Sequence, residues 1–107
     1  MSLSTHVLDL ESGQPAKNIR VTISRDGAEI CTQATDDDGR CGDLLEGAAL
    51  EPGTYQLVFD VASYFAERSG ETFYDKIPVA FIITDTTRHY HVPLLLSPFG
   101  YSTYRGS

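Results

Sequence analysis

Hydrophobic and polar residues alternate with a period of two along several short segments of the chain. The alternation is clearest in 55–61, where the odd-numbered positions are hydrophobic and the even-numbered positions are mostly polar. Residues 19–24 repeat this pattern, whereas 79–83 is apolar enough to be covered on both faces. Side chains in a β-strand point alternately to opposite faces, so the pattern predicts a strand in each segment.

Turn-forming residues separate these segments at short intervals. They occur at 12–15, 26–27, 38–39, 51–53 and 97–98. Asp26-Gly27 predicts a tight hairpin, because glycine accepts the positive φ that such a turn requires. Several short strands at this spacing predict an all-β protein, an antiparallel β-sandwich with two sheets of about four strands each.

One segment predicts a helix. Residues 63–69 favour a short helix of two turns at most, with Ser63 as its N-cap and Gly70 as its stop. The 107 residues contain no linker, internal repeat or change in composition. We therefore expect a single domain over residues 1–107.

The segment 89–97 has two apolar faces. Its even positions supply a core face, so His89, His91, Pro93, Leu95 and Ser97 must share the other face. A small sandwich has no third layer to cover that second face. We expect another copy of the chain to cover it, which would put His91 at or near a subunit interface.

Charge and composition exclude several classes of function. The formal net charge of −7 argues against nucleic acid or an anionic membrane surface as the main partner. No stretch is long and apolar enough to span a membrane, and the first residues do not resemble a secretory signal, so we expect a cytoplasmic protein. Cys31 and Cys41 have neither metal-site nor redox-motif spacing and are interpreted as reduced thiols.

Candidate chemistry is concentrated in the histidines and near the C-terminus. Tyr101–Ser107 carries aromatic, hydroxyl and guanidinium groups. His89 and His91 face the same way on a strand, and with His6 they would suit a three-histidine zinc site, although two surface histidines are the commoner meaning of this spacing. Arg40, directly after the Asp36–Gly39 turn, is suited to binding an anionic or carbonyl-rich ligand.

Four segments together give the chain a family resemblance. They are Thr5-His6-Val7-Leu8-Asp9, Asp38-Gly39-Arg40, His89-Tyr90-His91-Val92-Pro93-Leu94-Leu95-Leu96-Ser97-Pro98 and Tyr104-Arg105-Gly106-Ser107. The chain resembles the 5-hydroxyisourate hydrolases, the transthyretin-like enzymes of urate breakdown, over nearly its whole length. The Tyr-Arg-Gly-Ser end separates these enzymes from transthyretin, the hormone carrier of the same fold.

The resemblance implies a function and an assembly. It implies hydrolysis of 5-hydroxyisourate to 2-oxo-4-hydroxy-4-carboxy-5-ureidoimidazoline, by attack of water on a ring amide, without metal or organic cofactor. It implies a homotetramer, a dimer of dimers, with active sites between the dimers.

The resemblance also implies roles for five residues. His6, Arg40, His91 and Ser107 would be catalytic, and Tyr104 would bind substrate together with His6 and Arg40. The two histidines would form the acid/base pair, with their division of labour left open, and the terminal carboxylate would orient a histidine or the water. A transthyretin-type carrier of a small ligand and a three-histidine zinc hydrolase stay as alternatives.

Overall fold

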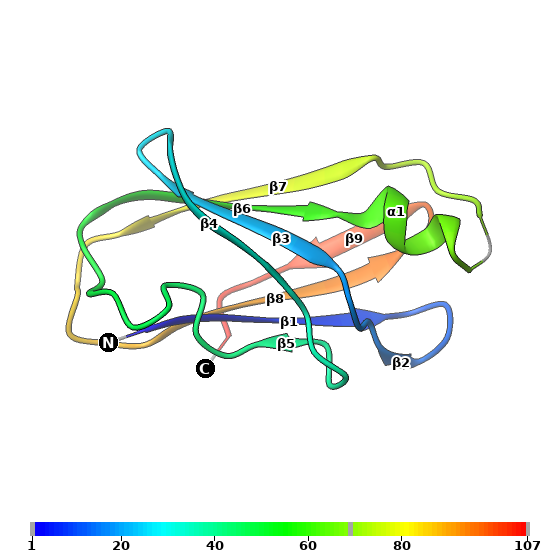
Figure 1. The fold of residues 1–107 in the computed structure, drawn as a ribbon, viewed down its shortest axis with the longest axis horizontal. Helices are drawn as coiled ribbons and strands as arrows, with labels where there is room; N and C mark the ends of the chain where they lie inside the picture. The colour runs from blue at the N-terminus through cyan, green and yellow to red at the C-terminus, as the bar shows by residue number, and fades with distance from the viewer. Residues whose placement is uncertain (1, 69, 107) are drawn as a thin grey trace.

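Two β-sheets pack face to face in the computed structural model, which describes residues 2–68 and 70–106 (Figure 1). The first sheet contains β1 (Leu3–Asp9), β2 (Gln14–Pro15), β5 (Arg40–Cys41), β8 (Tyr90–Ser97) and β9 (Gly100–Thr103). The second contains β3 (Arg20–Arg25), β4 (Ala28–Ala34), β6 (Gly53–Asp60) and β7 (Lys76–Ile83). The predicted all-β antiparallel sandwich is confirmed.

The order of strands places the N-terminal and C-terminal strands side by side. The first sheet runs β2-β1-β8-β9, with β5 paired to β1, and the second runs β4-β3-β6-β7. All strand pairs are antiparallel except β1 with β8, which run parallel over seven residue pairs. This parallel pair forms the middle of the first sheet.

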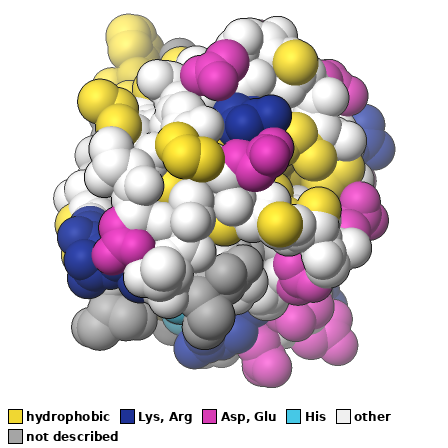
Figure 2. All heavy atoms as spheres, turned by 90° about the vertical axis from the view of Figure 1, so that its left-hand side faces the viewer, with side chains coloured by type: hydrophobic (Ala, Val, Ile, Leu, Met, Phe, Trp, Pro, Cys, Tyr) yellow, Lys and Arg dark blue, Asp and Glu magenta, His cyan; other side chains and the backbone are white. Residues whose placement is uncertain are grey.

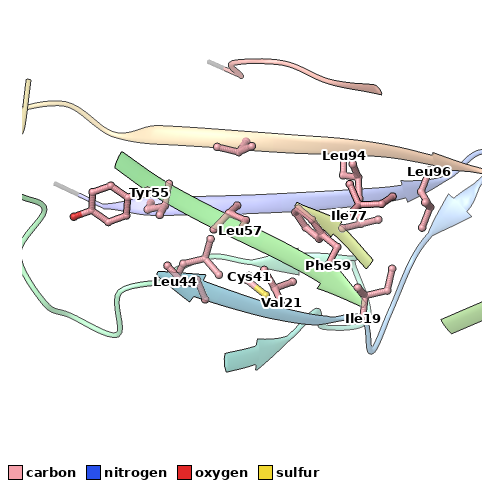
Figure 3. Packing of buried hydrophobic residues seen from close by; sticks show 14 of the residues in the cluster. Ile19, Val21, Cys41, Leu44, Tyr55, Leu57, Phe59, Ile77, Leu94 and Leu96 are labelled. Carbon is pink, nitrogen blue, oxygen red and sulfur yellow. The ribbon is translucent and has the colours of Figure 1, made fainter. Parts of the chain in front are cut away.

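Alternating side chains of β6 and β8 form much of the core between the sheets. Tyr55, Leu57 and Phe59 of β6 are buried, and Leu94 and Leu96 of β8 are fully buried opposite them (Figure 3). The strand predicted over 55–61 is thus confirmed except at its end, because Val61 already belongs to the helix. One cluster of buried residues draws on both sheets.

The predicted hairpin at Asp26-Gly27 is confirmed. It joins β3 to β4, and both turn residues have positive φ, 49° at Asp26 and 86° at Gly27. Both central residues of a type I′ turn need this conformation, and its twist matches that of paired strands.

The helix begins earlier than the sequence predicts. It is α1 (Val61–Ala66), and its N-cap is Asp60 rather than Ser63. The Asp60 carboxylate accepts hydrogen bonds from both the backbone N–H and the hydroxyl of Ser63. Ser63 therefore sits in the first turn, as a donor to the cap. Gly70, with φ 78°, donates its N–H to the carbonyl of Phe65, consistent with its predicted role as the stop, whereas Ser69 lies outside the described residues.

The segment 79–83 forms part of β7, but it is covered on one face only within this chain. Ile77 and Ile83 are buried, whereas Ala80 and Ile82 are exposed. The prediction that both faces are covered is therefore wrong for a single copy. The reason is that the described part of the chain forms only two sheets, so the outer face of β7 has no third sheet above it.

The surface carries charges of both signs. Acidic side chains spread over the end of the sandwich that Figure 2 displays, with scattered hydrophobic side chains among them. No helix in the described part of the chain is long and apolar enough to cross a membrane.

A glycine holds β5 against β1. Gly39 has φ 74°, and its carbonyl accepts a hydrogen bond from the Val7 N–H at 2.8 Å. A Cβ at this position would lie 2.5 Å from the carbonyl oxygen of Val7, closer than side chains approach a backbone oxygen. Only glycine meets both requirements, the positive φ and the close approach.

Gly39→Ala should therefore destabilise the protein more than Gly27→Ala. Both changes force a Cβ into positive φ, which costs about 1 to 2 kcal/mol. Only Gly39→Ala adds a backbone clash, because nothing lies within 4 Å of a Cβ at Gly27. We expect a loss of about 1 kcal/mol for Gly27→Ala and about 3 kcal/mol or more for Gly39→Ala. Urea unfolding measures both, and equal losses would contradict a steric role for Gly39.

Candidate active site

The register of β1 against β8 puts polar side chains on the outer face of the first sheet. Ser4 lies opposite His91, and His6 lies opposite Pro93. The odd positions of β1 face inward, as the complete burial of Leu3 and Val7 shows. His6 and His91, which are half-buried, thus share the outer face, diagonally across two neighbouring strands.

The short strand β5 adds Arg40 to this face. Arg40 pairs with His6 on the other side of β1. The preceding turn is held by the Asp36 carboxylate, which accepts hydrogen bonds from the N–H groups of Asp38 and Arg40, each at 2.9 Å. Arg40 is exposed, and among the described residues its guanidinium makes no ion pair. The turn thus presents the cationic side chain of Arg40 beside His6.

Serine hydroxyls hold the two strand histidines. The Oγ of Ser4 lies 2.7 Å from Nδ1 of His91 and 2.8 Å from Nε2 of His89. The Oγ of Ser2 lies 2.7 Å from Nδ1 of His89. The two imidazole rings are nearly parallel, with centroids 6.5 Å apart. Ser4 therefore joins His89 and His91 through one hydroxyl, which can donate one of these hydrogen bonds and must accept the other.

The tail after β9 folds back over β8. The N–H of Gly106 donates to the carbonyl of His91 at 2.8 Å. A Cβ at Gly106 would lie 2.6 Å from Cδ2 of His91 and 3.2 Å from Cγ of Pro93. Pro93 is buried beneath this segment. Part of the apolar face that the sequence assigned to another copy is thus covered by the chain itself.

A cavity of about 260 Å³ lies beside this tail, between the edges of the two sheets. It is lined by residues 79–82 of β7, residues 90–92 of β8 and residues 103–105 of the tail. Of the predicted site residues, His91 and Tyr104 line it, whereas His6 and Arg40 do not. The guanidinium of Arg105 lies 5.2 Å from the ring centre of Tyr90, which helps to hold the tail at this edge.

The surroundings of His91 favour its neutral form. Burial lowers the pKa of His91, and the nearby charge of Arg40 and the rings of His89 and His6 lower it further. A neutral imidazole has a lone pair on one ring nitrogen and can act as a base. Since Nδ1 of His91 is hydrogen-bonded to Ser4, Nε2 is the ring nitrogen that can accept a proton from another group.

The structure thus brings three of the predicted residues, His6, Arg40 and His91, to one face. Tyr104 lies at the neighbouring cavity, and Ser107 lies outside the described residues. Sequence reasoning missed Ser2 and Ser4. Their signal was present, because Ser2, Ser4 and His6 follow one another at a spacing of two, as His89 and His91 do. The pairing of β1 with β8, which brings the two sets together, was not predicted.

The candidate zinc site is not assembled in the described part of the chain. In residues 2–68 and 70–106, no group of three or more His, Cys, Asp or Glu side chains is arranged to hold a metal ion. Both ring nitrogens of His89 are occupied by serine hydroxyls, which explains why it is not arranged as a ligand. Cys31 and Cys41 are free thiols, as predicted, and burial raises the pKa of Cys41 to about 11.

The sandwich and its polar outer face define a protein of the transthyretin-like class. The sequence profile of the HIUase/Transthyretin family matches residues 3–106, and the chain belongs to that family.

Several relatives are similar over their full length. The 5-hydroxyisourate hydrolase of Mus musculus is 49% identical, with 98% of this chain and 94% of the relative aligned. The structure of Klebsiella pneumoniae 5-hydroxyisourate hydrolase superposes with a TM-score of 0.91 at 36% identity, covering 100% of both chains. Sea bream transthyretin in complex with thyroxine also gives a TM-score of 0.91, at 29% identity, covering 99% of this chain and 95% of that one.

Replacing Arg40 should raise the pKa of His91. In Arg40→Gln the nearby positive charge is gone, so the imidazolium becomes easier to form and the pKa moves up toward its ordinary value. It should not reach that value, because burial, the larger cause, is unchanged. NMR titration of the His91 ring measures the shift, and Arg20→Gln on β3 of the other sheet is the matched control. An unchanged midpoint in Arg40→Gln would show that Arg40 does not act on His91.

Proposed function

We propose that this chain hydrolyses 5-hydroxyisourate, a step of urate catabolism. The observation that carries the proposal is the meeting of His6, Arg40 and His91 on one face of the first sheet. The similarity to 5-hydroxyisourate hydrolases over the whole chain supports it. The product would be 2-oxo-4-hydroxy-4-carboxy-5-ureidoimidazoline.

The chemistry requires a base and a positive or hydrogen-bonding cradle. Water is a weak nucleophile toward an amide carbonyl, and the tetrahedral intermediate carries a costly negative charge on oxygen. A histidine whose surroundings favour its neutral form meets the first need, and an exposed guanidinium meets the second. The outer face supplies both within one short stretch of β1, β5 and β8.

Each residue then has a role. His6 and His91 act as the acid/base pair around the attacking water. Arg40 binds the urate-like ring and stabilises the oxyanion. Tyr104, at the edge of the neighbouring cavity, contacts the substrate, and Ser107 completes the site.

The two alternatives are less well supported. A hormone-type carrier has no need of a neutral histidine beside an exposed arginine, and transthyretin of sea bream is less similar in sequence than the hydrolases. A zinc hydrolase would need His6, His89 and His91 to converge, whereas His89 is bonded to Ser2 and Ser4.

The proposal includes a homotetramer, a dimer of dimers with the active sites between the dimers. Within the described residues, β7 and β9 are the last strands of their sheets, and a second copy can extend a sheet at such an edge. Large hydrophobic side chains are exposed near these edges, with Ile82 72% and Phe99 63% exposed. On the outer face, Leu8 and Leu95 are only half-buried, which suits burial by a facing dimer. We further propose that the enzyme works in the cytoplasm.

Arg40→Ala and His91→Asn should each lower the rate of hydrolysis roughly 100- to 1,000-fold, because one loses the oxyanion partner and the other a base. The assay follows the ultraviolet absorbance of freshly generated 5-hydroxyisourate. Arg20→Ala, which removes an exposed arginine from the other sheet, is the control and should retain wild-type turnover. Chelation should have no effect, and activity that is lost on chelation and restored by zinc would favour the zinc hydrolase.

In solution the chain should sediment as a particle of four chain masses. Ile82→Asp on the exposed face of β7 introduces a charge beside the proposed contact and should shift the particle toward smaller species, because burying an unpaired carboxylate is costly. Analytical ultracentrifugation over a range of concentrations measures this. A monomer at all concentrations would contradict the tetramer without touching the chemistry of the face.

A further inference from the structure

Four polar side chains on β1 and β8, and directly beside them, form one hydrogen-bonded chain. It runs from Ser2 to His89, then to Ser4 and then to His91, with steps of 2.7, 2.8 and 2.7 Å. Ser4 is 7% exposed, so water does not readily replace its hydroxyl. His89, the second member, is exposed, whereas His91 at the inner end is half-buried. This hydrogen-bond network thus connects His91, the proposed base, to a second imidazole at the surface.

The hydrogen bonds of this network can point in either of two directions. A hydroxyl has one proton to donate, and a neutral imidazole has one N–H and one lone pair. If Ser4 donates to Nε2 of His89, it accepts the Nδ1–H of His91, and Nε2 of His91 is a lone pair. If Ser4 donates to Nδ1 of His91 instead, Nε2 of His91 carries a proton. The state of His91 is therefore coupled to that of His89.

Charge makes this coupling useful. A base that takes a proton from water becomes an imidazolium, and at His91 that charge would be half-buried and close to Arg40. Arg40 of β5, His6 of β1 and His89, which directly precedes β8, all disfavour a positive charge there, in addition to burial. Among the described residues no carboxylate is paired with His91 to offset it. A path that moves the charge outward would remove this cost.

We propose that Ser4 and His89 form a proton relay behind His91, as positioning residues that let one histidine serve first as base and then as acid. The inference rests on the proposed hydrolysis. In the first step a water O–H bond breaks as its oxygen attacks the carbonyl carbon, and the proton bonds to Nε2 of His91. The Nδ1 proton of His91 passes to Oγ of Ser4, and the hydroxyl proton of Ser4 passes to Nε2 of His89.

The second step reverses the path. His89 returns its Nε2 proton to Ser4, Ser4 returns a proton to Nδ1 of His91, and His91 delivers its Nε2 proton to the leaving ring nitrogen as the carbon–nitrogen bond breaks. The net transfer is one proton from water to that nitrogen, and all three side chains return to their starting states. Between the steps the positive charge lies on His89, in contact with solvent and farther from Arg40 than at His91.

Substitutions at His89 separate a relay from a spacer. His89→Gln keeps a hydrogen-bonding group near Ser4 but cannot take up a proton, whereas His89→Leu removes both properties. A relay requires both variants, and Ser4→Ala, to lower kcat roughly 10- to 100-fold with little change in KM. Ser24→Ala on β3 is the control and should match wild type. Full kcat in His89→Gln would overturn the relay.

Hydrogen isotopes give a second kinetic measurement. In mixtures of light and heavy water, the wild-type rate should fall along a curved line, because several protons move in the same step. In Ser4→Ala the line should become straight. A straight line in the wild-type enzyme would contradict concerted transfer through Ser4.

A readout that does not need turnover keeps the inference separate from the proposed function. The ¹⁵N chemical shifts of the His91 ring report which nitrogen carries the proton. In wild type Nδ1 should be the protonated nitrogen at neutral pH, and Ser4→Ala should shift the population toward Nε2–H. If the wild-type protein did not hydrolyse 5-hydroxyisourate, the proposed function would be overturned. Identical ¹⁵N shifts in wild type and Ser4→Ala would instead overturn the relay. Thermal unfolding of each variant identifies any that fail to fold. If Ser4→Ala fails to fold, the variants of His89, which is exposed, still test the relay.

Discussion

The parallel pairing of β1 with β8 determines which side chains can meet on the outer face. In this ladder Ser4 lies opposite His91 and His6 opposite Pro93. On the inner face the same ladder buries Leu3, Val7 and Leu94 completely. Because side chains alternate, a slip of one residue would send the histidines into the core and these hydrophobic residues to the surface. Burial on one side of the sheet thus fixes the polar arrangement on the other.

Local features of the fold could be predicted from the sequence, because their causes are local. Alternation around Tyr55 and Phe59 identified β6, and Asp26-Gly27 identified the hairpin between β3 and β4. The start of the helix was missed, because Asp60 and Ser63 are both suitable N-cap residues. Only the three-dimensional structure shows which of the two side chains accepts the hydrogen bond from a free backbone N–H. The exposure of one face of 79–83 was also not predicted. The sequence pattern shows that the segment is apolar, but it does not show whether another layer covers each face.

The site was predictable in part. The resemblance selected His6, Arg40 and His91, and the structure places them on one face. It gave no role to Ser4 or His89, because their contact joins residues 85 positions apart in the sequence. A spacing of two at the start of β8 indicates that His89 and His91 share a face, but only the register of β1 places a hydroxyl between their rings. Side-chain chemistry that depends on the pairing of distant strands cannot be predicted from either strand alone.

The C-terminal tail packs so closely on His91 that it restricts the position of the imidazole ring. The backbone of Gly106 is bonded to the carbonyl of His91, and even one added methyl group there would meet the imidazole. Position 106 therefore has no room for a side chain where the backbone now lies. Gly106 has no reactive group of its own, yet its backbone limits where the imidazole ring of His91 can lie.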